Sequence, residues 1–584
     1  MIALERPGSA GSGRVLHVLH TKRSLLFAGA LLILLGGFLA HCIQTTGGIR
    51  VLDVRFAGTG ATLMSGLLYV PPNATPKTPA PAILAIHGYF NSREAQDGFA
   101  IEFARRGYVV LAIDQTGHGY SAPPAFANAF GGPDGLRYLR SLDVVDKDNI
   151  GLEGHSMGGW AVMNAAAALP NGYRAVVLEG SSTGAPFAPE GTTTFPRNLA
   201  VVFSKFDEFP QIMWGVPDAQ EVVHSPKLNT LFGSGRHAEP GRIYGSIADG
   251  SARILYMPNG THPMDHLSTA AIGYSLEWFQ HTLHGGTRKP PGDQIWYWKE
   301  IGTLTALIGF ILLLLGAVEL FLRMPYFSPL TKVPDAATRT RDRHAWATLL
   351  TGSIISAITL LPFFELGHQL LPPTHLFPQA FTNEIAVWAV LNALVVAALA
   401  WRPTGDATRF NMHVSRSILI AILTVGIGYL ALVATDFLFE VDFRIWFMAL
   451  KLMSPAQARA FLMYLPLFTL YFVVVLRVLH SRPLARSDGG AVEYLANIAA
   501  LAGGLLVYVI FQYGWLFTNH HLVSFFMNDP LRTIISIGFV PLLSSVAIVS
   551  TFVFRRTNSY LPGALICALV VTWYCVAGQA THAT

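Results

Sequence analysis

The fold is decided by Gly154-His155-Ser156-Met157-Gly158, a stretch in which two glycines flank a serine. Residues 149–153 before it predict a short buried strand, and the alanine-rich residues 159–168 after it predict a helix. A Gly-x-Ser-x-Gly sequence between a strand and a helix is typical of a nucleophile elbow, a strained turn that projects the serine Oγ above the sheet. Backbone N–H groups at the start of the following helix face any oxyanion formed there. Ser156 is therefore the candidate nucleophile.

The composition indicates a membrane protein with a globular insert. Hydrophobic residues make up 52% of the 584 and charged residues 13%, and the mean hydropathy is +0.43. Residues 44–299 have a mixed, globular composition, whereas long apolar runs dominate the rest. The net charge of +5 does not indicate a nucleic-acid partner, because the basic residues lie mainly between apolar runs. Cys42, Cys567 and Cys575 lie in or beside apolar runs, so we expect no disulfide framework, no thiolate metal site and no cofactor.

Nine apolar segments approach the length of about 20 residues that crosses a bilayer. They cover residues 24–43, 303–322, 347–365, 384–400, 417–437, 461–476, 494–517, 534–554 and 561–576. Pro362, Pro466 and Pro541 fall inside them, which the bilayer tolerates where neighbouring helices satisfy the backbone. We interpret residues 443–452 as a candidate interfacial helix.

Basic residues are concentrated in alternate loops between these segments. These loops contain Lys22, Arg23, Arg323, Lys332, Arg339, Arg341, Arg343, Arg402, Arg409, Arg416, Arg477, Arg482, Arg486, Arg555 and Arg556. The opposite loops contain only Arg444, Lys451, Arg459 and Arg532. By the positive-inside rule, residues 1–23 are cytoplasmic and residues 44–300 lie outside the cytoplasm, with Trp296 and Trp298 in the outer aromatic belt.

The first apolar segment is predicted to be a retained signal anchor. Its apolar core exceeds the roughly 7–15 residues of a signal peptide. In Leu39-Ala40-His41-Cys42, His41 also stands where a processing site needs a small residue. The sequence therefore predicts a multi-pass protein of the cell membrane, with an anchor at residues 24–43 and about eight helices in residues 301–584. It does not indicate an oligomeric state.

The segment between the first two spans alternates predicted strands and helices. Strands are expected at residues 51–56, 63–70, 82–86, 109–113, 149–153, 175–179, 199–203 and 254–257, and helices at 99–106, 136–142, 159–168 and 270–283. The first two strands form a hairpin around Gly58-Thr59-Gly60. Such alternation predicts a mostly parallel sheet covered on both faces, with ligands bound beyond the carboxyl ends of its strands.

Three motifs carry a family resemblance. They are Ala85-Ile86-His87-Gly88-Tyr89, the run Asp-Gln-Thr-Gly-His-Gly-Tyr-Ser at residues 114–121, and the serine motif extended by Gly159. Over roughly residues 50–285 the sequence resembles the α/β-hydrolase superfamily, in particular its serine aminopeptidase-like and dienelactone-hydrolase-like members. The resemblance implies an α/β-hydrolase fold and the chain order nucleophile, acid, histidine. The apolar remainder, predicted to be an all-α transmembrane domain, resembles no family.

The implied acid lies in the loop after residues 199–203. Asp207 stands at the family's position, where a carboxylate would accept the imidazole Nδ1–H and stabilise the imidazolium. Glu208 and Glu179 remain alternatives, the second because some members place the acid one strand earlier.

The implied base follows the last strand in Pro258-Asn259-Gly260-Thr261-His262. His262 would take the Ser156 proton and return it to the leaving group, with His266 as the alternative. The Met157 N–H and the Tyr89 N–H are the expected oxyanion donors, each contributing roughly 3 kcal/mol. We interpret His155, His118 and Asp114 as structural.

Ionisable residues recur at the predicted outer ends of the spans. They are Glu365, His368, His375, Glu384, Asp436, Glu440, Asp442, His520 and His521. We expect them to be hydrated, interfacial groups; a functional role or a metal site built from the four histidines is the alternative.

Three function classes fit these observations. The first is an extracytoplasmic serine hydrolase that cleaves a small-molecule or lipid ester, thioester or amide through an acyl-enzyme. The second is an acyltransferase with the same triad and a lipid or envelope-glycan acceptor. The third is a transporter or scaffold with an inactive hydrolase domain. Residues 210–215 form an apolar piece that could cap the pocket.

Overall fold

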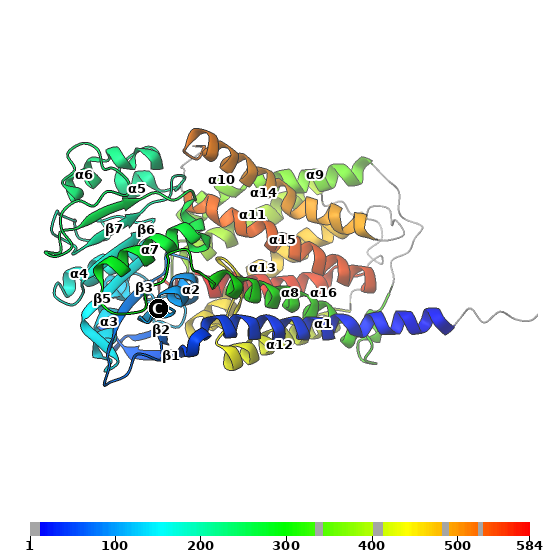
Figure 1. The fold of residues 1–584 in the computed structure, drawn as a ribbon. Helices are drawn as coiled ribbons and strands as arrows, with labels where there is room; N and C mark the ends of the chain where they lie inside the picture. Colours follow the sequence, from blue (N-terminus) through cyan, green and yellow to red (C-terminus); the bar gives the residue numbers. More distant parts are fainter. Residues whose placement is uncertain are drawn as a thin grey trace, which may run out of the picture.

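The computed structural model describes residues 12–90, 92–332, 343–400, 413–481, 490–523 and 530–583. Within these residues, a sheet covered by helices lies against the end of a bundle of long helices (Figure 1). We call these parts the sheet domain and the helical domain. Residues 1–11 lie outside the described residues. So do six of the predicted basic-loop residues, Arg339, Arg341, Arg402, Arg409, Arg482 and Arg486.

The sheet domain is built on eight strands in the order β1-β2-β4-β3-β5-β6-β7-β8. β1 (Arg50–Ala57) pairs antiparallel with β2 (Leu63–Val70), and β2 pairs antiparallel with β4 (Val109–Asp114). The remaining strands are parallel: β3 (Ala80–Ile86), β5 (Val145–His155), β6 (Ala175–Glu179), β7 (Leu199–Val202) and β8 (Arg253–Tyr256). Every predicted strand is confirmed. β5 begins four residues before residue 149, because the polar run at 146–148 extends the strand at its exposed end.

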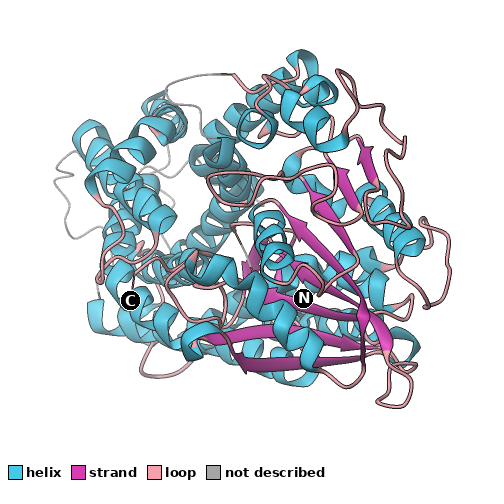
Figure 2. Ribbon diagram, turned by 90° about the vertical axis from the view of Figure 1, so that its left-hand side faces the viewer, coloured by secondary structure: helices cyan, strands magenta, loops and turns pink. Residues whose placement is uncertain are grey.

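Helices cover both faces of the sheet, as the alternation predicts (Figure 2). Side chains of α3 (Gly132–Ser141) and α4 (Met157–Ala168) share a core with Leu84 and Ile86 of β3. Side chains of α2 (Asp97–Ala104) and α7 (Thr269–Thr282) share a second core with Ile83 and Ala85. Successive side chains of a strand point to opposite faces, so a fully apolar strand needs a helical layer on each side. Between β7 and β8 the chain forms α5 (Pro210–Trp214), η5 (Ala219–His224) and α6 (Pro226–Phe232).

The helical domain contains α1 (Ser12–Gln44), α8 (Trp296–Leu322), α11 (Ala380–Ala400), α12 (Val414–Phe439), α13 (Pro455–Ser481), α14 (Ala491–Asn519), α15 (Pro530–Thr557) and α16 (Leu561–Gly578). Counting only described residues, eight helices are long and apolar enough to cross a membrane, or nine if one bent pair is a single span. That pair is α9 (Arg343–Ile358) and α10 (Leu360–Leu370), bent by 49°. Pro362 explains the break, since it has no N–H to bond the Ile358 carbonyl.

Glycines at heptad spacing bring α1 and α8 into backbone contact. A Cβ on Gly36 would lie 2.4 Å from the Gly302 carbonyl oxygen, and one on Gly309 would lie 2.8 Å from the Gly29 carbonyl oxygen. A Cβ on Gly316 would likewise lie 2.3 Å from the Leu26 nitrogen. Small residues allow helices to approach this closely. α1 is therefore an integral part of the helical domain, beside α8 along its length (Figure 1).

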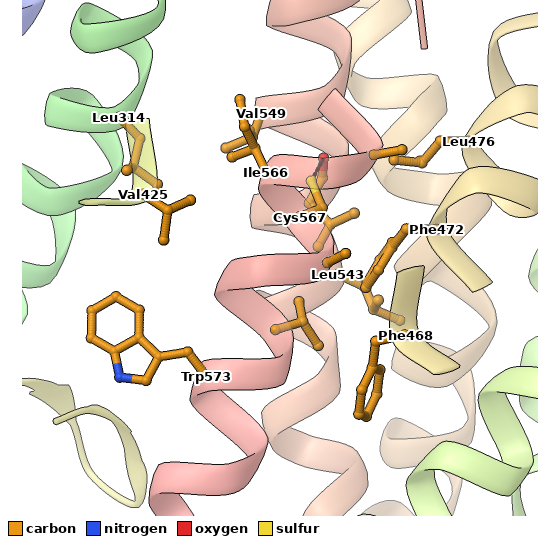
Figure 3. Packing of buried hydrophobic residues seen from close by; sticks show 14 of the residues in the cluster. Leu314, Val425, Phe468, Phe472, Leu476, Leu543, Val549, Ile566, Cys567 and Trp573 are labelled. Atoms are coloured by element: carbon orange, nitrogen blue, oxygen red, sulfur yellow. Dashed lines mark hydrogen bonds between the residues drawn. The ribbon is translucent and has the colours of Figure 1, made fainter. Parts of the chain in front are cut away.

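The interior of the helical domain is apolar and draws on many helices. Figure 3 shows Phe468 and Phe472 of α13 packed near Leu543 of α15 and Cys567 of α16, with Trp573 on another side of α16. Cys567 and Cys575 are buried free thiols and Cys42 is an exposed one.

The prediction of an interfacial helix at residues 443–452 is wrong. β9 (Phe443–Ile445) and β10 (Met448–Leu450) form an antiparallel hairpin with Phe443 opposite Leu450. Apolar and charged residues alternate in Phe443-Arg444-Ile445, which is a period of two rather than 3.6. Trp446 makes the turn with φ at +59°.

The prediction that Trp296 belongs to an aromatic belt is also wrong. Its side chain is buried in the core of the sheet domain and donates from Nε1 to Gln294 Oε1 at 2.7 Å. The first turn of α8 packs on α2, and Lys299 of α8 is ion-paired with Asp97 of α2. Trp298, on the other side of this turn, is exposed.

Candidate active site

Ser156 occupies a strained turn between β5 and α4. Its φ and ψ are +54° and −121°, a conformation that L-residues rarely adopt. A Cβ on Gly154 would lie 2.3 Å from the Gly158 carbonyl oxygen, and a Cβ on Gly158 would lie 2.0 Å from the Ile86 carbonyl oxygen. Both glycines of the motif are therefore required by backbone contacts. The turn leaves Ser156 on the wall of a cavity at the carboxyl end of the sheet.

Asp207 and His262 form a buried hydrogen-bonded pair at the same end of the sheet. Asp207 follows β7 and His262 follows β8, and His262 Nδ1 lies 2.8 Å from Asp207 Oδ2. The other Asp207 oxygen accepts the Phe209 N–H at 2.8 Å. Burial lowers the pKa of His262 from 6.5 to about 3 and raises the pKa of Asp207, so the imidazole is neutral.

The alternative residues make other contacts. The His266 ring contacts the His155 ring, with the centroids 4.1 Å apart and the ring planes tilted by 53°. Glu179 accepts a hydrogen bond from Ser275, and burial raises its pKa. Of the two candidate histidines, His262 is the one that the Asp207 carboxylate orients.

Glu208 links this pair to the helical domain. Its Oε2 accepts the His262 backbone N–H at 2.7 Å, and its Oε1 accepts the Tyr513 hydroxyl of α14 at 2.7 Å. Burial and the neighbouring Asp207 raise the pKa of Glu208 to about 8. Sequence reasoning considered Glu208 only as an acid and missed Tyr513 altogether, because nothing in an apolar helix marks one tyrosine as a partner of a distant loop.

The expected oxyanion donors border the same cavity. Met157 is the first residue of α4, and Tyr89 follows β3. The Tyr89 carbonyl lies 2.7 Å from His118 Nε2, and its hydroxyl lies 3.0 Å from His582 Nε2. Asp114 accepts the Arg93 and Tyr120 N–H groups at 2.9 and 3.0 Å, so it shapes the neighbouring loop.

The last described residues also reach the site. The Thr581 N–H donates to the Gly117 carbonyl at 2.8 Å, and the Ala125 N–H donates to the Thr581 carbonyl at 2.7 Å. The residues that directly follow α16 therefore extend from the helical domain to the loops of the sheet domain. Its contact with Tyr89 was not predicted, because no local motif marks it.

The cavity at Ser156 has a volume of about 800 Å³ and lies between the two domains. The sheet domain contributes an apolar wall of Tyr89, Phe126, Phe130, Met157, Trp160, Phe187, Phe209, Ile212 and Met213. The helical domain contributes Glu365, His368, Ala380, Phe381, Glu384, Leu531, Arg532 and His582. As predicted for residues 210–215, α5 borders the pocket.

The charged side chains of the helical wall are paired with one another. Arg532 donates from Nη1 to Glu365 at 2.8 Å and from Nε to Glu384 at 3.2 Å. His368 Nδ1 lies 3.2 Å from the other oxygen of Glu384. Glu384 is only 3% exposed, so the expectation of a hydrated group is wrong for this residue. The reason is that Arg532 of α15 and the Gly367 face of α10 pack against Glu384.

Two further basic residues of the helical domain lie at the domain interface. Arg444 is in β9 and Lys451 directly follows β10. Their side chains lie 3.5 and 3.7 Å from Glu94 of the sheet domain. Arg444 also pairs with Asp442, which is buried rather than hydrated.

The described side chains include no group of three His, Cys, Asp or Glu that could hold a metal ion. His368 contacts Glu384, whereas His520 lies 2.8 Å from Gln220 of the sheet domain. The histidines proposed for a metal site therefore serve separate contacts.

A mostly parallel sheet with a serine elbow after β5, an acid after β7 and a histidine after β8 is the arrangement of an α/β-hydrolase domain. Residues 81–239 match the family model described as alpha/beta hydrolase fold. The sheet domain is thus an α/β-hydrolase domain, joined to a helical region with many long apolar helices.

Curated relatives match parts of the chain. A monoacylglycerol lipase of Mycolicibacterium smegmatis is 28% identical over 209 residues, which cover 34% of this chain and 68% of that protein. An uncharacterized protein of Mycobacterium tuberculosis is 36% identical over 97 residues, which cover 15% of this chain. The matched part spans 26% of that relative's length.

Similar solved structures include an esterase from Pyrococcus furiosus, with 14% identity and a TM-score of 0.29 over 40% of this chain and 92% of that one. A dienelactone hydrolase from Anabaena variabilis has 17% identity and a TM-score of 0.28, over 40% of this chain and 99% of that chain.

Proposed function

We propose that this protein is a membrane-embedded serine hydrolase that cleaves an ester, thioester or amide with Ser156, His262 and Asp207. One observation carries the proposal: the strained Ser156 and the hydrogen-bonded Asp207–His262 pair lie at the same end of one parallel sheet.

The reaction follows from these positions. Neutral His262 takes the proton of Ser156 as Oγ attacks the carbonyl carbon, and Asp207 stabilises the imidazolium. The N–H groups of Met157 and Tyr89 stabilise the oxyanion of the tetrahedral intermediate. His262 then protonates the leaving group, leaving an acyl-Ser156 ester that water hydrolyses by the same steps.

The proposed location is a membrane, with the N-terminus cytoplasmic and the sheet domain outside. The alternate loops of basic residues support this orientation. Of the four basic residues in the opposite loops, Arg444, Lys451 and Arg532 lie beside carboxylates, which accounts for their departure from the pattern. The backbone packing of α1 on α8 supports a retained anchor, because its removal would expose the glycine face of α8.

An ester is the favoured substrate, since a relative of the sheet domain is a monoacylglycerol lipase. An acyltransferase is the second candidate. The active-site cavity is partly walled by the helical domain, which would suit an acceptor drawn from the membrane. A scaffold with an inactive domain is disfavoured by the intact elbow and acid–histidine pair.

A fluorophosphonate probe on membranes that contain the full chain tests the proposal. We expect labelling of the wild type and of Ser141→Ala, a control at an exposed position, and no labelling of Ser156→Ala. Labelling that persists in Ser156→Ala would exclude Ser156 as the nucleophile. Release of free acid, rather than transfer to added lipid, would separate hydrolase from acyltransferase.

A further inference from the structure

The two walls of the cavity at Ser156 differ in chemistry. The sheet domain presents aromatic and aliphatic side chains on either side of the serine, among them Trp160, Phe187 and Phe209. The helical domain presents the ion-paired residues Glu365, Arg532 and Glu384. A ligand that fills both halves has an apolar part and a polar part.

The polar wall lies at the ends of helices. Arg532 is in the first turn of α15, Glu384 follows the first turn of α11, and Glu365 is in α10. If these helices cross a membrane, the polar wall lies near the level of the lipid head groups. An amphiphilic ester bound in the cavity then has its head group at the polar wall and its ester group at Ser156.

The charge of this wall does not favour an anion. Among the described residues that line the cavity, the charges are two carboxylates and one guanidinium, beside the imidazole of His368. Arg532 is 4% exposed and already neutralised by carboxylate oxygens at 2.8 and 3.2 Å. The two carboxylates outnumber the one guanidinium, which disfavours a phosphate or carboxylate at this wall.

The hydrogen-bonding capacity of the wall suits hydroxyl groups. A carboxylate oxygen has two lone pairs and accepts only, whereas a guanidinium donates only. A hydroxyl donates to the first and accepts from the second, so several hydroxyls on one head group match a wall on which the two alternate. A quaternary ammonium has no N–H or O–H group, so it cannot donate a hydrogen bond to the carboxylates.

We propose that Glu365, Arg532 and Glu384 form a subsite for the uncharged, hydroxyl-bearing head group of an amphiphilic ester whose acyl chain lies along the aromatic wall. This inference rests on the proposed function, since it assigns the substrate class of the same site. The helical domain is then part of the active site and selects the substrate by its head group.

The test compares esters of one acyl chain with different head groups, using the full chain in nanodiscs of zwitterionic lipid. The substrates are monooleoylglycerol, a glucose mono-oleate, oleoylcholine and oleoyl lysophosphatidic acid. We expect kcat/KM for the better of the two hydroxyl-bearing esters to exceed that for lysophosphatidic acid and oleoylcholine by roughly tenfold or more. The first two substrates distinguish a glycerol head group from a sugar.

The variants Glu365→Gln and Glu384→Gln each remove one negative charge and keep a side chain of the same shape. We expect the ratio of kcat/KM for the preferred hydroxyl-bearing ester to that for lysophosphatidic acid to fall by roughly tenfold in each. Two variants are used so that a loss of stability in one of them does not decide the test. The ratio of the two kcat/KM values does not depend on the amount of active protein. The control is Glu493→Gln, which breaks a similarly buried ion pair with Arg555. Glu493 is in the first turn of α14, at the opposite end of this helix from Tyr513, so the ratio stays at the wild-type value.

The outcomes separate this inference from the proposed function. If the wild type cleaves lysophosphatidic acid or oleoylcholine as fast as the hydroxyl-bearing esters, the inference is overturned. The same holds if both glutamine variants keep the wild-type ratio. Loss of the proposed function has a different signature, because then p-nitrophenyl butyrate, which has no such head group, is not cleaved in a Ser156-dependent way.

Discussion

The sheet domain and the helical domain use glycine and buried charge in different ways. In the sheet domain, Gly154 and Gly158 permit one strained turn, and the buried Asp207–His262 pair lies beside it. In the helical domain, glycines at heptad spacing permit two helices to touch along their length. Its buried charges at the docked end pair with one another, as in Glu365–Arg532, or with Glu94 across the interface. In the sheet domain, a locally strained turn thus forms the candidate site. In the helical domain, contacts between residues far apart in the sequence support that site.

Asp207→Asn breaks the chemistry of the sheet domain and has the largest expected effect. The amide cannot stabilise the imidazolium, so kcat/KM for p-nitrophenyl butyrate falls by roughly 10⁴-fold. Fluorophosphonate labelling slows in parallel, while thermal unfolding shows whether the domain is folded. Near-normal turnover in Asp207→Asn would contradict the role of this carboxylate.

Gly309→Leu breaks the packing of the helical domain. The new side chain meets the Gly29 carbonyl oxygen and the Ile33 backbone, and a clash with backbone cannot be relieved by a rotamer change. We expect destabilisation of about 1–3 kcal/mol or more and a lower yield of folded protein in detergent. The matched control is Gly426→Leu on α12, where nothing lies within 4 Å of a new Cβ. Equal melting temperatures of the two variants would argue against close packing of α1 on α8.

Tyr513→Phe tests whether the helical domain positions His262, the proposed base. Loss of the Tyr513 hydroxyl leaves Glu208 Oε1 without its donor at 2.7 Å. The loop that carries His262 is then held less firmly. We expect kcat/KM to fall roughly five- to tenfold, mainly in kcat, since one hydrogen bond to a buried group contributes about 1 kcal/mol. An effect confined to KM would place Tyr513 in substrate binding instead.

The pH dependence of stability sharpens the comparison at the contact between the two domains. Glu208 has a pKa of about 8 in the folded protein and an ordinary value of 4.5. Between these values the unfolded chain loses a proton that the folded protein keeps, so stability falls as the pH rises from about 5 to 8. Glu208→Gln cannot ionise, and we expect its melting temperature to fall less over this range. Identical pH profiles of the two proteins would show that Glu208 does not titrate there.

The strands and the elbow could be predicted because each depends on a local pattern, whereas the order of the site residues was implied by the resemblance to α/β-hydrolases. Alternating apolar runs, the flanking glycines of Ser156 and the turn residues before His262 all lie within a few positions of the feature they predict. The helix at 443–452 was predicted wrongly although the alternation at 443–445 has a period of two, and Trp296 was placed in an aromatic belt although contacts with the core of the sheet domain bury it.

By itself, then, the sequence determined that an α/β-hydrolase sheet with a serine elbow is joined to long apolar helices. Only the tertiary structure decided that Asp207, rather than Glu179, contacts His262, that Glu208 and Tyr513 hold the histidine loop, and that Arg532 borders the cavity at Ser156. The physical reason is separation along the chain: residues that lie hundreds of positions apart leave no periodic signal, and their contacts arise only when the two domains dock.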